Sequence, residues 1–333
     1  MNVLVVGAGF SGSTVARILA DKGHAVTVID QRDHVGGNAF DYINGKGITV
    51  HKYGPHLFHT NNKQVYDWLS RFTEWVPYEH KAKAILSDGS LVPFPVNQNT
   101  LDVVDQQDVH SIFFEPYSKK MWGKYYPDIN KDVADRVRVK DNRDDRYFSD
   151  IYQVMPANGY TKMFDNMLNH ANISVKLNKT FDHHMESLYD HTFNSMSIDH
   201  YYDYKYGKLP YRSIKFTDIT LPIDKVFPVA TVNFTDNDKY TRVTEWKNIP
   251  NHGDNHSFTS LTFEQPCEDD ENNGERYYPV MTDQNKSLYN IYKQIPNDKV
   301  TFIGRCGLYA YLDMHMAVSS SISVANKFLN SID

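Results

Sequence analysis

The first thirty residues constrain the fold of this chain more than any other stretch. An apolar run at "NVLVV" leads into "GAGFSG", a G-x-G-x-x-G pattern formed by Gly7, Gly9 and Gly12. The next residues repeat apolar side chains at helical spacing, and "HAVTVID" then resumes as a second apolar strand. This order of strand, glycine-rich turn, helix and strand is the context that a dinucleotide-binding fingerprint requires. The sequence therefore predicts an α/β, Rossmann-like domain.

Each part of the fingerprint has a physical role. Gly7 permits the tight turn, Gly9 lets the backbone approach a pyrophosphate, and Gly12 lets helix and strand pack closely. The N-terminus of the helix then faces the phosphates, because its backbone N–H groups attract anions. Asp30 ends the second strand, where a carboxylate can hold the adenosine ribose. We therefore expect a bound nucleotide cofactor here.

A second glycine pair, Gly36-Gly37, follows Asp30 after six residues. Flavoproteins of the glutathione-reductase-like superfamily have such a pair where the backbone runs close to the cofactor, whereas NAD dehydrogenases usually continue into the next crossover. The pair favours FAD over NAD, and an ordinary loop is the alternative.

Composition excludes several other classes of function. The chain has 333 residues, enough for two or three domains, and a formal net charge of −6. No long basic run is present, so we expect no nucleic-acid partner, and any anionic ligand must be held by a few placed arginines. Only Cys267 and Cys306 are present, far apart, which favours a reducing, cytoplasmic compartment.

The N-terminus is apolar and rich in small residues, as in a signal peptide. It lacks a basic segment, and the glycine turn interrupts the apolar run after a few residues. No stretch approaches the roughly 18 uncharged residues of a membrane span. We therefore expect no membrane insertion.

The stretch "YGPHLFHT" contains His56 and His59 in an H-x-x-H pattern, which could be half of a metal site. The glutamate of a zincin helix is missing, and Gly54-Pro55 would break such a helix. His183, His184 and His191 lie in a polar stretch that is typical of a solvated surface. We expect no metal site.

Several unusual strings carry a resemblance that spans nearly the whole chain: "HVGGNAFD", "VHKYGPHLFHTNN", "YFSDIYQVMPANGYTKMF", "YTRVTEW", "YYPV" and "YLDMH". In this order and spacing they resemble the bacterial UDP-galactopyranose mutases. The resemblance implies an FAD-binding domain of the glutathione-reductase-like type, a small helical domain and an antiparallel β-sheet domain. We expect residues 1–76, 152–205 and 296–333 in the first domain, 98–150 in the second, and 77–97 with 206–295 in the third.

The chemistry that the resemblance implies is the interconversion of UDP-galactopyranose and UDP-galactofuranose through a covalent adduct between flavin N5 and the sugar. Only reduced FAD is active in this scheme, so a reductant such as NAD(P)H is implied. The protein holds a diphosphate that leaves and returns, and the guanidinium group of arginine suits that task. This division of labour agrees with the lack of an evident Ser-His-Asp or Cys-His set.

The family's site residues carry over to matching positions. The catalytic set is Arg136, Arg242, His59, Tyr311 and Asp313. The substrate-binding set is Phe113, Phe114, Tyr117, Trp122, Tyr147, Asn233, Tyr278 and His80. The cofactor-binding set is Gly7, Gly9, Phe10, Ser11, Gly12, Asp30, Gly37, Asn38, His56, Arg305, Asp313 and Met314.

Some of these assignments have alternatives. Tyr277 could exchange roles with Tyr278. Phe113, Phe114 and Tyr117 are expected to form the uracil platform, but their helical spacing also suits a core. Asp313 is expected to cap the amphipathic C-terminal helix, whose N-terminus would face the flavin pyrimidine and favour its anionic reduced form.

The chain departs from the family at two places. Between "FPVNQNT" and "FFEPYSKKMWG" it lacks a few tens of residues that relatives use for pairing subunits, so the oligomeric state does not carry over. His80 stands where relatives have asparagine, and an imidazole that titrates near neutrality could reshape the pocket. UDP-arabinopyranose is therefore an alternative substrate. A flavin amine-oxidase-like enzyme and a catalytically inactive flavin-binding module are the rival functions.

Overall fold

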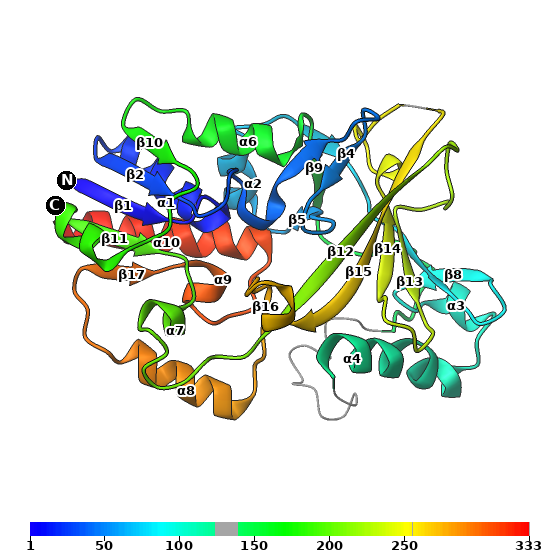
Figure 1. The fold of residues 1–333 in the computed structure, drawn as a ribbon. Helices are drawn as coiled ribbons and strands as arrows, with labels where there is room; N and C mark the ends of the chain where they lie inside the picture. The colour runs from blue at the N-terminus through cyan, green and yellow to red at the C-terminus, as the bar shows by residue number, and fades with distance from the viewer. Residues whose placement is uncertain (124–138, 255, 333) are drawn as a thin grey trace.

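The computed structural model describes residues 1–123, 139–254 and 256–332. Two large sheets lie at opposite ends of the molecule (Figure 1). The sheet on the left lies beside both termini, and the sheet on the right is flanked by α4 below it. Residues that are far apart in the sequence build each sheet, so the fold is assembled from discontinuous segments.

The left-hand sheet has five strands, all paired in parallel. Its order is β10 (Ile173–Lys176), β2 (Ala25–Ile29), β1 (Asn2–Val6), β11 (His191–Asn194) and β17 (Val300–Phe302). β1 and β11 are apolar or uncharged along their length because both faces of a parallel sheet are covered. This sheet confirms the predicted Rossmann-like fold.

Helix α1 (Phe10–Asp21) covers this sheet and packs against α10 (Met314–Ile332) and α6 (Gly159–Leu168). The predicted helical face is buried, since Val15 and Leu19 have no exposed surface. The ring of Phe10 lies edge-on to Phe164 in the core, with centroids 4.8 Å apart. The other α-helices of the described residues are α2 (Lys63–Leu69), α3 (Gln98–Leu101), α4 (Glu115–Trp122), α7 (Ile198–Tyr201), α8 (Asp283–Lys293) and α9 (Gly304–Gly307).

The right-hand sheet has seven strands. Its order is β16 (Tyr278–Pro279), β12 (Tyr211–Leu221), β15 (Thr259–Glu268), β14 (Arg242–Glu245), β13 (Thr231–Phe234), β7 (Ala82–Ile85) and β8 (Leu91–Phe94). All neighbours are antiparallel except β13 and β7, which pair in parallel. The predicted antiparallel sheet is therefore present and includes one parallel pair. β7 comes from a separate, earlier segment and forms its hairpin with β8, so no hairpin joins it to β13.

Two small antiparallel sheets connect the larger ones. They are β5 (Phe58–Thr60), β9 (Tyr152–Pro156) and β6 (Trp75–Pro77) in the first, and β3 (Asp41–Ile43) with β4 (Thr49–His51) in the second. Short helical turns fill several connections: η1 (Gly37–Ala39), η2 (Gln106–Asp108), η5 (His183–Leu188), η6 (Trp246–Asn248), η7 (Asp270–Asn272) and the π-helical η3 (His110–Phe114). The strands of the two large sheets lie inside the segments predicted for their domains, and the division into three domains itself stays a prediction.

After β17 ends at Phe302, Gly304 begins the short helix α9 with φ 73°. One local prediction is wrong. His191 was expected on a solvated surface, but it lies in β11 and is 9% exposed. Its ring packs against Phe328, with centroids 4.6 Å apart, because the neighbouring strands and α10 enclose it.

Within the described ranges, no helix is long and apolar enough to cross a membrane. The same residues contain no group of three or more His, Cys, Asp or Glu side chains that could hold a metal ion.

Candidate active site

The glycine-rich turn forms a cradle of bare backbone. Gly7 has φ 101°, and a Cβ on Gly12 would lie 1.9 Å from the Gly7 carbonyl oxygen. Gly9 and Gly37 lie back to back, since a Cβ on Gly37 would lie 2.9 Å from the Cα of Gly9. Gly9 is the N-cap of α1 and provides no side-chain cap. No side chain larger than a hydrogen atom fits at Gly12 or Gly37, so the backbone N–H groups of the helix terminus are open to a pyrophosphate.

Asp30 joins this cradle to the end of β2. Its Oδ2 accepts the Ala8 N–H at 2.8 Å, and its Oδ1 accepts the Arg32 N–H at 2.9 Å. Each oxygen keeps a second lone pair for a ribose hydroxyl. Arg32 also donates to Oδ1 of Asn38 at 2.9 Å, so Asn38 contributes to this end through Arg32. Since the ring of Phe10 is in the core, Phe10 and the buried Ser11 reach a cofactor mainly through their backbone.

Arg242 is the centre of a second cluster, in the seven-stranded sheet. It begins β14, opposite Asn233 of β13 and Glu264 of β15. Its Nε lies 2.8 Å from Oε2 of Glu264, whose side chain is 1% exposed. Burial raises the pKa of Glu264, and the Arg242 cation opposes that shift. The sequence reasoning did not find Glu264, although a charged residue facing Arg242 in strand register was a usable signal.

Three tyrosines surround this arginine. Burial alone would lower the pKa of Arg242, but the Glu264 carboxylate and the hydroxyls of Tyr117, Tyr278 and Tyr147 raise it above its ordinary value. Arg242 therefore remains a cation, and the phenols lie within its electrostatic reach. The structure thus brings together four predicted residues from α4, β14, β16 and the segment before β9.

Tyr278 stacks on Tyr311 with centroids 5.5 Å apart. The Arg305 guanidinium lies 5.1 Å and 5.0 Å from these two ring centroids and donates to the carbonyls of Leu312 and Tyr277. Arg305 therefore supports the tyrosine pair. Tyr277 is 5% exposed and packs with core residues, which favours Tyr278 for the role that the sequence left open.

The two histidines of "YGPHLFHT" have different partners. His59 Nδ1 lies 2.7 Å from Oδ2 of Asp150, and its ring stacks on Phe148 with centroids 3.7 Å apart. His56 donates from Nδ1 to the Gly54 carbonyl at 2.9 Å. Burial lowers the pKa of His56 to about 4, and the nearby Arg305 and Arg242 cations act in the same direction. Asp150 and Phe148 were not predicted.

His80 is buried beside Tyr147. Its carbonyl accepts the Tyr147 N–H at 2.6 Å, and its Nδ1 lies 3.0 Å from the Tyr78 hydroxyl. Burial, with smaller effects of the Arg242 and His59 charges, lowers the pKa of His80 to about 3. The expectation that this imidazole titrates near neutrality is therefore wrong, because the ring is kept from water and lies near a cation.

The aromatic set on η3 and α4 divides into core and exposed members. Phe113 is 5% exposed and packs on Phe94, with centroids 6.1 Å apart, as the core alternative predicts. Phe114 and Trp122 are half-buried, and Tyr117 is 39% exposed. Tyr117 is therefore the member of this set with the most exposed surface for a planar base.

Family profiles and sequences of known proteins match this chain over the segments that form both clusters. The family profile described as GLF, UDP-galactopyranose mutase, matches residues 112–311, and that of an NAD(P)-binding Rossmann-like domain matches residues 5–72. A dTDP-fucopyranose mutase of Escherichia coli is 34% identical over 99% of this chain and 98% of its own length. A probable UDP-galactopyranose mutase of Klebsiella pneumoniae is 32% identical over 99% of this chain and 95% of its own length.

The chain belongs to the UDP-galactopyranose mutase family. It is a pyranose/furanose mutase of that family, an isomerase with a nucleotide-sugar substrate. The crystal structure of a reduced UDP-galactopyranose mutase has the same fold, with a TM-score of 0.79 and 16% identity over 99% of this chain and 95% of that one. The alignment to the Escherichia coli relative spans 375 residues against 333 here, which agrees with a shortened chain.

Several predicted residues of the mutase lie near α10. Asp313 directly precedes this helix, and its carbonyl accepts the Ala317 N–H at 2.9 Å, as at an N-cap. Met314 is the first helical residue and packs on the main core.

Two other predicted residues belong to other segments of the chain. Asn233 of β13 donates to the Lys83 carbonyl of β7 at 3.3 Å. Arg136 lies outside the described residues, so its role stays a prediction.

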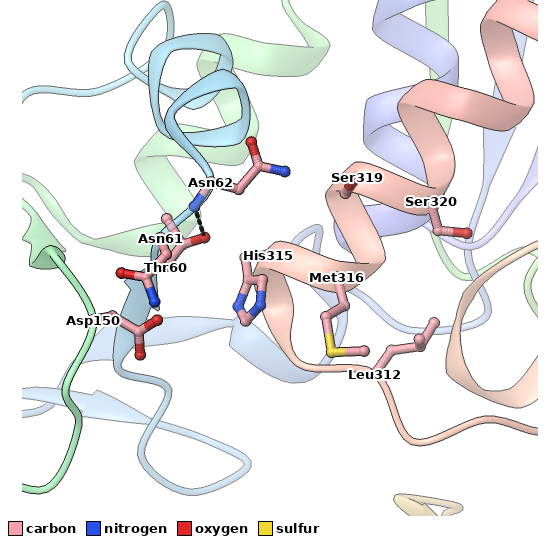
Figure 2. A pocket seen from close by; sticks show the side chains of 9 residues that line it. All are labelled: Thr60, Asn61, Asn62, Asp150, Leu312, His315, Met316, Ser319 and Ser320. Carbon is pink, nitrogen blue, oxygen red and sulfur yellow. Dashed lines mark hydrogen bonds between the residues drawn. The ribbon is translucent and has the colours of Figure 1, made fainter.

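A cavity of about 570 Å³ opens beside this helix end. Figure 2 shows His315 of α10 pointing toward Asn61 and Asp150 across it. The lining residues are Thr60, Asn61, Asn62, Asp150, Leu312, His315, Met316, Ser319 and Ser320. Asp150 connects the cavity to His59, so the polar wall borders the predicted site of this mutase.

Proposed function

We propose that this mutase interconverts UDP-galactopyranose and UDP-galactofuranose. The observation that carries the proposal is Arg242, held by the buried Glu264 and surrounded by Tyr117, Tyr147 and Tyr278. A cation with phenol donors around it suits a diphosphate, because guanidinium N–H groups and phenol O–H groups donate hydrogen bonds to phosphate oxygens.

The chain's own residues would hold the diphosphate while it leaves and returns. His56 and His80 are neutral at neutral pH, since the pKa values of their rings are about 4 and about 3. They add no charge to the site, and His56, whose Nδ1 donates to the Gly54 carbonyl, can accept a hydrogen bond at Nε2. The cationic contribution in the described cluster then comes from Arg242 and Arg305, and Arg136 is proposed to add a further cation.

We propose FAD as the cofactor and its reduced form as the active one. The Gly9–Gly37 cradle fits the pyrophosphate, Asp30 fits the ribose, and the Asp313–Met314 end of α10 fits an anionic ring edge. When bound, reduced FAD supplies the nucleophile for the anomeric carbon. The reductant is a donor such as NAD(P)H.

Replacing Gly37 with alanine is expected to weaken FAD binding at least about tenfold, because the new Cβ would lie 2.9 Å from Gly9 and the residue has φ 56°. Gly45→Ala is the matched control, since its Cβ meets nothing within 4 Å. Titration of apoprotein with FAD, followed by flavin fluorescence, measures both. Equal affinities for the two variants would contradict the cradle assignment.

The similarity to a dTDP-fucopyranose mutase favours a second candidate substrate. dTDP-fucopyranose keeps the galactose ring configuration but lacks the 6-hydroxyl, and its nucleoside is thymidine. UDP-arabinopyranose, which lacks the whole hydroxymethyl group, is the third candidate. The Arg242 cluster serves the diphosphate of all three, so discrimination depends on contacts to the base and to C6.

Steady-state assays of the dithionite-reduced holoenzyme with the three sugars decide between them. We expect turnover of all three with UDP-galactopyranose highest, because a missing small group changes binding by only about 1–3 kcal/mol. A preference for dTDP-fucopyranose would move the assignment to that sugar. A preference for UDP-galactopyranose beyond about a thousandfold would refute cross-reaction. Oxygen consumption with amines, without added reductant, would instead revive the oxidase alternative.

A further inference from the structure

Two buried histidines lie directly behind the Gly54–His56 loop. His51 ends β4, and His252 follows η6 in a loop whose carbonyl at His252 accepts the Thr49 N–H at 2.9 Å. Their Nε2 atoms are 2.9 Å apart, and the residues are 0% and 3% exposed. The proposed chemistry uses neither ring, so the pair needs its own explanation.

The hydrogen bonds fix where each proton lies. His252 Nδ1 is 2.8 Å from the Pro250 carbonyl, which can only accept, so this nitrogen carries the hydrogen. A neutral His252 then has a bare Nε2, so His51 must donate to it from Nε2. His51 Nδ1 is therefore bare and accepts the backbone N–H of His56 at 3.1 Å. Every ring nitrogen of the pair has one role.

An added proton would break this arrangement. On His252 it would place two N–H groups face to face, and on His51 it would oppose the His56 N–H. Around the pair lie Trp246, with its ring 4.8 Å from that of His51, and Tyr160, at 5.6 Å. The nearby titratable groups are His56 and Asp41.

The surroundings favour the neutral form. Burial lowers the pKa of both rings, that of His51 well below its ordinary value. The Asp41 carboxylate would favour a charged His252, but it already accepts the N–H groups of Tyr160 at 2.6 Å and Thr161 at 2.8 Å.

The loop held by this pair contacts the substrate cluster. Gly54 has φ 79°, and a Cβ there would lie 2.8 Å from the Phe216 ring and 3.2 Å from Oε1 of Glu264. The loop therefore lies directly on the carboxylate that pairs with Arg242. His56 donates from Nδ1 to Gly54, which leaves its Nε2 as an acceptor in a ring near Arg305 and Arg242.

We propose that His51 and His252 are positioning residues, a neutral pair with fixed tautomers that holds the Gly54–His56 loop against Glu264. Through that loop they set the position of Arg242 and the acceptor role of His56. The structural part stands on the geometry alone, and its catalytic consequence rests on the proposed function.

The structural part is tested on the full-length protein without substrate. Nitrogen-15 NMR of histidine-labelled protein at pH 7 should show His51 with hydrogen on Nε2 and His252 with hydrogen on Nδ1. In His252→Leu, hydrogen exchange at the His56 amide should accelerate at least about tenfold, while His252→Gln, whose amide oxygen can accept from His51, should retain protection. An imidazolium, the opposite tautomers, or equal exchange in all three proteins would overturn the pair.

The catalytic consequence is tested by steady-state kinetics of the reduced holoenzyme. His252→Leu should lower kcat about 10- to 100-fold, because small displacements of a site cost rates of this size, and His252→Gln should restore most of it. His191→Leu is the control: a buried histidine in β11 is lost, but kcat should not change.

Unchanged kcat in His252→Leu, no recovery in His252→Gln, or equal losses in His191→Leu, would refute the positioning role. If the wild-type enzyme turned over no nucleotide sugar, the proposed function would fail, while the NMR and exchange results would still decide the histidine pair.

Discussion

Replacing Arg242 with methionine is expected to lower kcat/KM by about 10²- to 10³-fold. Methionine keeps the length of the side chain but removes the charge and the N–H donors that would hold the diphosphate. Losing one such donor in a preorganised site costs rates of this order. The FAD content should not change, because Arg242 lies in the seven-stranded sheet and the glycine cradle lies at the other sheet.

A single substitution also leaves Glu264 buried without its cation, which would destabilise the fold. The double variant Arg242→Met/Glu264→Gln removes both charges and separates this effect from catalysis. Arg71→Met is the matched control, because Arg71 pairs at the surface with Asp21 of α1, which covers the five-stranded sheet. A double variant that kept kcat/KM within tenfold of wild type would show that Arg242 does not hold the diphosphate.

Acidification from pH 7 to pH 5 is expected to lower the free energy of unfolding by roughly 5 kcal/mol, a large part of the 5–15 kcal/mol typical of a folded domain. Burial lowers the pKa of His80 to about 3 and the pKa values of His56 and His191 to about 4. The unfolded chain binds these protons near pH 6.5 and the folded chain does not. Stability is therefore full above pH 6.5 and falls as the pH drops toward 4, by roughly 2 kcal/mol for each histidine.

Urea denaturation of the FAD-saturated protein at a series of pH values measures this slope. His191→Leu should reduce the loss of stability by roughly 2 kcal/mol, since it removes one of these buried rings. His256→Leu should leave it unchanged, because the side chain of His256 is 88% exposed. A stability that stayed constant between pH 7 and pH 5 would contradict the neutral buried state of these histidines.

The sequence pattern predicted those parts of the fold that depend on contacts between residues close together in the chain. The turn from Gly7 to Gly12 was readable because its glycines are required by contacts within a few residues of sequence, such as the 1.9 Å approach of a Cβ on Gly12 to the Gly7 carbonyl. The helix α10 was readable because its apolar face repeats at helical spacing. The resemblance to a known family predicted Arg242 and the three tyrosines that surround it.

The remaining features depend on contacts between distant segments. Glu264 is buried only because β15 pairs with β14, and His252 meets His51 across 201 positions of sequence. His80 seemed a titrating group because sequence carries no measure of burial. The structure lowers its pKa by removing water from the ring. Long-range burial, and the proton positions that it fixes, could not be read from the chain alone.

The most direct test of the account compares ring interconversion by the same holoprotein in two redox states. UDP-galactopyranose is incubated anaerobically with the dithionite-reduced enzyme and with the oxidised enzyme, and the furanose product is separated by chromatography. We expect turnover by the reduced enzyme and at least about a hundredfold less by the oxidised one, because a cofactor nucleophile requires the reduced flavin. Equal rates in both states, or turnover by protein that contains no flavin, would contradict the proposed chemistry.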